Sequence, residues 1–257
     1  RIAWMLYHDL GVERVSDEER RDFRDENEDS LDPAIADNRR LVSLYRQSCN
    51  GEYLPACNRL GDLFRDGDRV PSSARQAAEF YAMACSGGFG ESCHELGKLY
   101  EQGEGVEENR QQARGLYGTA CGGGYLAACT ALGDWTIQEG GPRATTQALA
   151  LYSSACQAGN MRGCLGIGII HDEGIDRPEN NEEAASFYRT ACEGEEAEAC
   201  FRLGVLNMSG SGVVQNLERG ATLFRDGCEF GFEWSCYQYA LLLESGEGVE
   251  LDLTEAY

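Results

Sequence analysis

The stretch that decides the fold runs AAEFYAMACSGGFGESCHELGKLYEQGEGV over residues 77–106. Apolar side chains from Ala77 to Cys85 recur at i, i+3, i+4, i+7 and i+8, which is one face of a helix. A second run with helical spacing extends from Cys93 to Tyr100, after a turn at Gly87-Gly88. The stretch therefore predicts two helices joined by a short turn.

This pattern recurs along the chain, and the cysteines show its period. The 12 cysteines form six pairs with seven residues between the members, and the first cysteines are separated by 36, 36, 35, 36 and 36 residues. The pairs are Cys49 with Cys57, Cys85 with Cys93, Cys121 with Cys129, Cys156 with Cys164, Cys192 with Cys200, and Cys228 with Cys236. A fixed period of this size predicts an all-α solenoid of about six helix-turn-helix units.

Other positions repeat in the same frame. An aromatic residue precedes each first cysteine by four: Tyr45, Tyr81, Tyr117, Tyr152, Tyr188 and Phe224. A small residue follows each second cysteine by four: Gly61, Gly97, Gly133, Gly168, Gly204 and Ala240. We expect Tyr81, Tyr117 and Tyr188 of this series in the core, and the small residues where two helices approach closely. Helix starts are expected after good N-cap residues, namely Asp37, Ser73, Asn109, Asn180, Asn216 and Asp252.

The ends of the chain differ from the repeat. Residues 1–12 resemble the close of a preceding repeat, and residues 37–257 are predicted to hold six repeats and the start of a seventh, as part of a longer solenoid. Between them, residues 13–36 form an acidic insertion. Its core, Glu13 to Asp32, carries ten acids and four arginines, which suits a solvated loop or a segment that seeks a partner.

Paired cysteines at the end of one helix and the start of the next favour one disulfide per repeat. Closing so short a loop stabilises a chain by about 2.6 kcal/mol in the chain-entropy model. Structural zinc prefers two to four residues between ligands and is the less favoured alternative, and no metal is expected. Disulfides place the protein in an oxidising compartment, either periplasmic or extracellular, or in the mitochondrial intermembrane space.

Acidic residues dominate the charge balance. Asp and Glu number 44 against 22 Lys and Arg, a net charge of −22, and Lys98 is the single lysine. This balance disfavours binding to nucleic acid or anionic lipid, because both need a cationic footprint. It suits a basic protein or peptide partner, or simply a solvated acidic surface. No run of 18 apolar residues exists, so direct membrane insertion is not expected.

The pattern Ala77-x3-Tyr81-x2-Ala84-Cys85-x7-Cys93-x2-Leu96-Gly97-x-Leu99-Tyr100-x2-Gly103-x-Gly105-Val106 resembles the Sel1-like repeat. More narrowly, it is similar to the disulfide-bridged Helicobacter cysteine-rich proteins, over about residues 36 to 257. The resemblance implies right-handed stacking into a superhelix, with the first helix of each unit on the concave side. The fourth unit departs from the pattern, since it is one residue short and Ala144 replaces a cap residue; in the last unit Tyr239-Ala240 replaces Leu-Gly.

The family implies several functions. Its members act mainly as adaptors, so the first hypothesis is a scaffold that binds a polypeptide or serves as a subunit of a larger assembly. Some bacterial members bind or weakly hydrolyse penicillins, and a mitochondrial relative serves respiratory-complex assembly. The alternatives are therefore a weak β-lactam hydrolase and an assembly factor for a respiratory or envelope complex. Haem binding in the groove is a further hypothesis, although no cofactor is expected.

Recognisable catalytic motifs are absent. A penicillin-recognising serine enzyme needs Ser-x-x-Lys, but Glu95 stands three residues before Lys98. His94-Glu95 begins like a zinc-protease helix, yet residue 98 is not the second histidine.

Candidate binding residues are the first-helix positions that differ between units. If those helices face a groove, the rows would line it, with small residues admitting a peptide and arginines offering forked donors. The alternative is that these positions only face solvent. The predicted partner-binding residues are Arg46, Glu79, Met83, Thr119, Ser153, Arg189 and Arg225.

Overall fold

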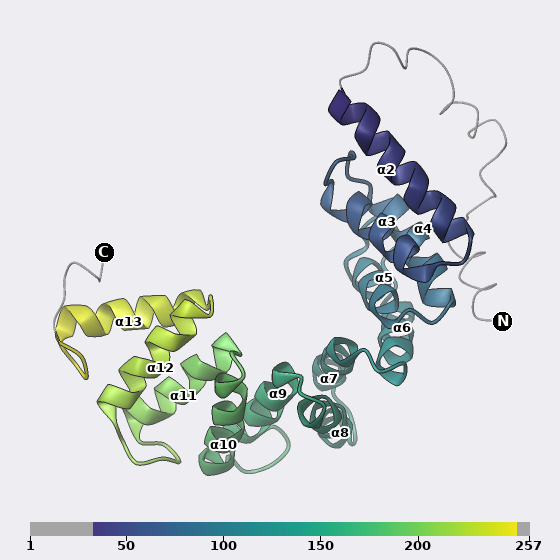
Figure 1. Ribbon diagram of the computed structural model, residues 1–257. Helices are drawn as coiled ribbons and strands as arrows, with labels where there is room; N and C mark the ends of the chain where they lie inside the picture. The colour runs from purple at the N-terminus through teal and green to yellow at the C-terminus, as the bar shows by residue number, and fades with distance from the viewer. Residues whose placement is uncertain (1–32, 251–257) are drawn as a thin grey trace. The chain divides into compact units, whose positions relative to one another are not determined.

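The computed structural model describes residues 33–250, and side chains from residue 38 onward. In this range it has twelve helices and no strand, which confirms the all-α prediction (Figure 1). The predictions for residues 1–12 and 13–32 and for Asp252 lie outside the described residues. The helices are α2 (Pro33–Asn50), α3 (Leu54–Asp66), α4 (Ala74–Ser86), α5 (Gly90–Gln102), α6 (Arg110–Gly122), α7 (Leu126–Glu139), α8 (Ala144–Gln157), α9 (Met161–Asp172), α10 (Asn181–Glu193), α11 (Ala197–Ser209), α12 (Leu217–Glu229) and α13 (Glu233–Ser245).

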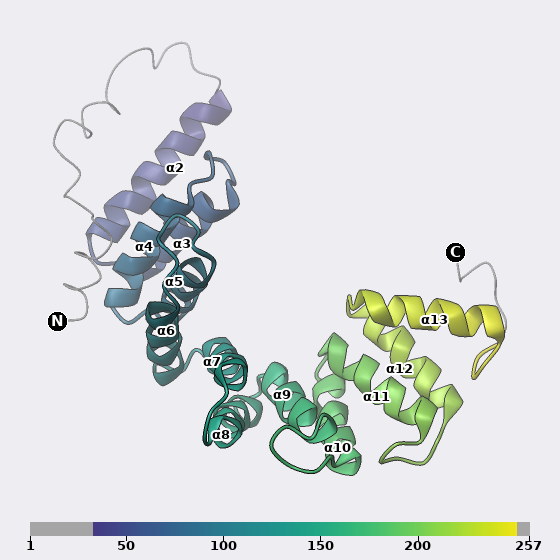
Figure 2. The same ribbon diagram turned by 180° about the vertical axis from the view of Figure 1, so that it is seen from behind.

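The described residues form two compact units, divided between Ala128 and Cys129. In the described part of the first unit, helices α2 to α6 each pack against the next, and α3 also contacts α5. In the second unit, helices α8 to α13 do the same, and α11 also contacts α13. Figures 1 and 2 show these helix pairs from opposite sides. None of the helices between residues 33 and 250 is long and apolar enough to cross a bilayer.

The predicted helix starts are confirmed at Ser73, Asn109, Asn180 and Asn216. Each side-chain oxygen accepts a hydrogen bond from the backbone N–H three residues later. The prediction for Asp37 is wrong, because α2 already begins at Pro33 and the expected boundary at residue 37 lies inside this helix. Proline suits a first helical position, since its φ is fixed and it has no N–H to leave unpaired.

Glycine ends the second helix of most repeats. Gly67, Gly103, Gly210 and Gly246 adopt the left-handed conformation, with φ between 70° and 77°, and their N–H groups bond the carbonyl four residues earlier. The first helix of the short fourth repeat, α8, starts without a side-chain cap. The residue before it is Arg143, whose φ is 77° and whose side chain makes no capping hydrogen bond.

One disulfide joins each first helix to the second helix of its repeat, as predicted. Five bridges have Cα–Cα separations of 4.5–4.8 Å, within the normal range. They join Cys49 to Cys57, Cys85 to Cys93, Cys156 to Cys164, Cys192 to Cys200, and Cys228 to Cys236. Cys121 and Cys129 are also disulfide-bonded, and no described cysteine is free.

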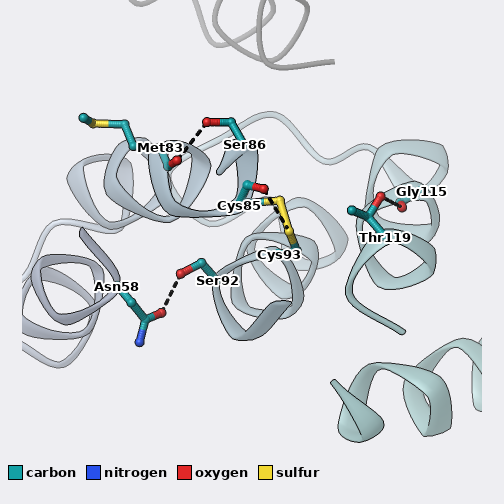
Figure 3. The surroundings of a disulfide bond; sticks show 8 residues. All are labelled: Asn58, Met83, Cys85, Ser86, Ser92, Cys93, Gly115 and Thr119. Carbon is teal, nitrogen blue, oxygen red and sulfur yellow. Dashed lines mark hydrogen bonds between the residues drawn. A yellow bond between two sulfur atoms is a disulfide. The ribbon is translucent and has the colours of Figure 1, made fainter. Parts of the chain in front are cut away.

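Each bridge lies at the turn between the two helices of a repeat. Figure 3 shows Cys85 and Cys93 where the end of α4 meets the start of α5. Both cysteines are buried, as are Cys57 and Cys164 at the corresponding position of other repeats. Because such bridges form and persist under oxidising conditions, they indicate an oxidising compartment.

The recurrent aromatic residue packs against the recurrent glycine of the preceding helix. A Cβ added at Gly61, Gly97, Gly133, Gly168 or Gly204 would lie less than 3.0 Å from that ring, a distance that real Cβ atoms essentially never show. The partner rings are Tyr81, Tyr117, Tyr152, Tyr188 and Phe224, all buried. The core role predicted for Tyr81, Tyr117 and Tyr188 is confirmed.

Each tyrosine of this series also satisfies its hydroxyl on the helix that carries the glycine. The hydroxyls of Tyr81, Tyr117, Tyr152 and Tyr188 donate to Asp62, Glu101, Asp134 and Asp172, respectively. Burial, with help from the neighbouring carboxylate, raises the pKa of all four phenols. The glycine therefore sets the helix separation, and the hydrogen bond sets the ring's direction.

Candidate binding surface

Second helices of neighbouring repeats are joined by an ion pair whose polarity differs between the two units. In the first unit, Arg65 Nη1 of α3 lies 2.7 Å from Glu95 Oε2 of α5. In the second unit, Asp172 of α9 stands at the repeat position of Arg65, and Arg202 of α11 at that of Glu95. The Arg202 Nη1–Asp172 Oδ2 distance is 3.7 Å. In both units one of these two positions is basic and the other is acidic. The arginine is at the first position in the first unit and at the second position in the second unit.

An aromatic cluster recurs beside this ion pair. In the second unit, the Phe201 ring centroid lies 5.6 Å from that of Phe224 and 5.3 Å from that of Phe232. These contacts cover part of Phe201 and bring Phe232, at the start of α13, onto α11.

His94 holds the corresponding position in the first unit. Its ring lies 5.3 Å from Tyr117 and 5.4 Å from Tyr125. Its Nδ1 is buried and makes no hydrogen bond to any described residue. Burial lowers the pKa of His94, although Glu95 acts in the opposite direction. His94 is therefore a neutral aromatic packing residue at pH 7.

A pocket of about 370 Å³ opens on the second-helix surface of the second unit. Its walls are largely apolar, and Trp234, on the first turn of α13, is 64% exposed. Its polar groups come from α9 and α11. The lining residues are Asp172, Glu198, Phe201, Arg202, Val205, Leu206, Phe232 and Trp234.

Arg202 is held in this pocket by carboxylates. Its Nε donates to Glu198 Oε1 at 2.9 Å, and its Nη1 lies 3.3 Å from Glu173 Oε1. Arg162, at the start of α9, is 3.8 Å from both Glu196 and Glu198. Burial raises the pKa of Glu196, and the neighbouring Arg162 opposes this shift.

The partner-binding residues predicted from sequence lie elsewhere, and none lines this pocket. In the first unit, the Arg46 guanidinium lies 5.6 Å from the Phe80 ring centroid and 5.8 Å from that of Phe64. Burial lowers the pKa of Arg46, and Glu79 opposes this shift, so Arg46 and Glu79 interact. Glu79 also pairs with Arg75 at 3.4 Å.

Met83 and Thr119 each take part in a hydrogen bond within their own helix, as Figure 3 shows. The Met83 carbonyl accepts from Ser86, and the Thr119 hydroxyl donates to the Gly115 carbonyl at 3.0 Å. Both side chains are at least partly accessible.

The remaining three predicted residues are in the second unit. Ser153 is half-buried, Arg189 is exposed, and Arg225 is exposed and paired with Asp226 at 3.0 Å. Sequence reasoning missed the pocket because it compared first helices only. The same comparison of second helices finds the pocket positions, since the residues at the Trp234 position also vary between repeats: Pro55, Glu91, Ala127, Arg162, Glu198 and Trp234.

Comparison with known proteins identifies the repeat. No curated protein matches the chain significantly. Solved structures do: a protective antigen of uropathogenic Escherichia coli with an SLR fold is 24% identical, with a TM-score of 0.69 over 82% of this chain. This chain spans only 46% of that antigen. A Sel1 repeat protein from Oxalobacter formigenes is 22% identical, with a TM-score of 0.71, over 88% of this chain and 98% of that one. These likenesses show a shared fold.

A third solved structure is Helicobacter pylori cysteine rich protein B, which is 24% identical over 50% of this chain and 93% of that one. Its TM-score of 0.42 is too low to support an argument.

The family model of the Sel1 repeat matches six consecutive segments of the chain. They are residues 54–89, 90–125, 126–160, 162–195, 197–229 and 235–257. Each matched segment begins near the start of a helix that carries the second cysteine of a pair. The bridges from Cys85 to Cys93 and from Cys192 to Cys200 therefore connect consecutive family units. The chain therefore belongs to the Sel1 repeat family.

Proposed function

We propose that this chain is a protein-interaction scaffold, and that a polypeptide partner docks on the surface formed by α11 and α13. Sel1 repeat proteins commonly mediate protein–protein interaction. The observation that carries the proposal is the largely apolar pocket lined by residues of α9, α11 and α13.

Trp234 of α13 lines this pocket and is 64% exposed. The Trp234 and Tyr237 rings meet edge to face with centroids 6.4 Å apart. Val205, 43% exposed on α11, lines the same pocket. Exposed aromatic clusters beside a pocket are typical of protein interfaces, where Trp and Tyr supply much of the binding energy.

The charge of the chain favours a basic partner. A net charge of −22 attracts cationic polypeptides and repels acidic ones. The disulfides support a periplasmic or secreted location for this complex. Arg46, Glu79, Met83, Thr119, Ser153, Arg189 and Arg225 form a second proposed set of contacts on the first helices.

A peptide selection tests the proposal. A random peptide library displayed on phage is selected on the oxidised protein, and the selected peptides are then measured by fluorescence polarisation. We expect basic peptides, and we expect their binding to weaken at least about tenfold in the double variant Val205→Ala/Trp234→Ala, because two such anchors contribute more than about 1.4 kcal/mol together.

The matched control is Leu44→Ala/Val214→Ala, which removes two exposed apolar side chains, 53% and 90% accessible, outside the pocket. Equal binding to both double variants, or no selectable peptide, would count against the scaffold on this surface.

A further inference from the structure

We infer that the pocket between α9, α11 and α13 receives an arginine or lysine side chain of the partner. This inference rests on the proposed scaffold function, and it adds the chemistry of the residue that is anchored. The pocket combines what a long basic side chain needs: apolar walls for its stem and carboxylates and an aromatic face for its charged end.

The apolar part of the pocket matches the stem. Val205 and Leu206 of α11 line it, and Phe232 lies at its edge on α13. Phe201 holds Phe232 in place through their ring contact at 5.3 Å. Trp234 is the most accessible lining residue, at 64%, and offers its indole face to a cation.

The polar part of the pocket is negative on balance. Its charged lining residues are the carboxylates of Asp172 and Glu198 and the guanidinium of Arg202, which pairs with both. The Asp172 and Glu198 side chains are only 24% and 23% exposed, so a charge near them is screened less than on an open surface. The net negative charge of these groups favours the binding of a cation over that of an anion.

The first unit carries its own cation at the corresponding place. Lys98, the single lysine of the chain, stands at the repeat position of Val205, and its Nζ lies 3.1 Å from Glu95 Oε2. Ala127 replaces Trp234 in that repeat frame. At these two repeat positions the first unit therefore has Lys98 and Ala127, whereas the second unit has Val205 and Trp234.

A direct test uses acetylated pentapeptides Gly-Gly-X-Gly-Gly-amide in which X is arginine, lysine, norleucine or glutamate. Binding is followed by NMR through the Trp234 indole N–H signal of the oxidised full chain, assigned by its loss in Trp234→Phe. We expect saturable shifts with arginine and lysine, and weaker ones with norleucine. Raising the salt concentration should reduce binding of the basic peptides.

Glu198→Gln should weaken binding of the arginine peptide by about tenfold, because a charge-assisted hydrogen bond is lost. The control Glu193→Gln removes the same charge from an exposed site on α10 outside the pocket, and should leave binding within about twofold. Asp172→Asn provides a second pocket variant in case Glu198→Gln disturbs Arg202.

The two proposals fail in different ways. Equal shifts by arginine and norleucine peptides would replace the inference with an apolar anchor, and preferred binding of the glutamate peptide would make Arg202 a carboxylate receptor. If library-selected peptides bind the wild type and both pocket variants equally, the scaffold stands and this inference falls. If no library peptide binds the wild type, the scaffold itself falls.

Discussion

The ring of Tyr117 packs on Gly97 so closely that a Cβ at residue 97 would lie 2.7 Å from the ring edge. The same relationship recurs between neighbouring helices at four other places in the two units. It explains why a glycine stands at this position in five of the six repeats, since a larger residue at position 97 would force α5 and α6 apart.

Gly97→Ala should therefore destabilise the first unit by about 1–3 kcal/mol, because overpacking a close helix contact shifts both backbones. The control is Gly115→Ala on α6, where an added Cβ meets nothing within 4 Å. That change should stabilise by up to about 1 kcal/mol, since alanine favours the helix. Urea unfolding followed by circular dichroism measures both, and a neutral or stabilising Gly97→Ala would contradict the packing role.

Exchanging the charges of Arg65 and Glu95 tests the ion pair that is reversed in the second unit. Arg65→Glu should destabilise the first unit, because it places two carboxylates side by side. Adding Glu95→Arg should recover part of the loss, with a coupling energy on the order of 1 kcal/mol. Full recovery is not expected, since Arg65 also contacts Asp66 and Glu95 also pairs with Lys98. Purely additive losses in the double-mutant cycle would show that the pair is uncoupled.

Acidification should destabilise the first unit through His94. Burial holds the pKa of His94 below its ordinary value of 6.5, with Glu95 and Glu101 opposing and Lys98 assisting. The unfolded chain then binds more protons than the folded one, so the stability from this residue is present above pH 6.5 and is lost as the pH falls through the folded pKa.

His94→Phe, which copies Phe201 of the second unit, should reduce the fall in unfolding free energy between about pH 7.5 and 5.5. The measurement is urea unfolding at a series of pH values. If the wild type and His94→Phe lose stability equally on acidification, His94 does not contribute.

Intact mass before and after reduction tests the bridges of the whole chain. The native protein should be lighter than the reduced chain by 12 thiol hydrogens and should take up no alkylating reagent. This result would also cover Cys121 and Cys129. Alkylation without reductant would overturn the oxidised scaffold, and it would reopen a metal or redox role for the cysteines.

Disulfides that connect consecutive family units should stabilise the junctions between repeats. Cys192→Ser/Cys200→Ser should cost about 2.6 kcal/mol in the chain-entropy model and weaken peptide binding at α11 and α13. Hydrogen exchange of α10 and α11 locates the loss. Unchanged protection in both helices would mean that packing alone holds this junction.

The sequence by itself determined what depends on neighbours along the chain. A cap such as Ser73 bonds a backbone N–H three residues away, a glycine such as Gly103 ends a helix, and Cys85 and Cys93 meet across one short turn. These relations are local, so their spacing is directly visible in the sequence. Because the motif occurs in every repeat, the pattern is recognised more reliably than a single occurrence would be. The exception, Asp37, was wrong because a proline upstream starts the helix equally well.

Only the tertiary structure decided which side chains of neighbouring repeats meet. Arg65 and Glu95 are 30 residues apart, and the pocket draws Asp172, Arg202 and Trp234 from three helices. Such contacts depend on how far each helix is rotated and shifted against the next, which is set by packing such as that of Tyr117 on Gly97. The repeat pattern shows that helices stack, but it does not show which of their outer residues come together to form a pocket.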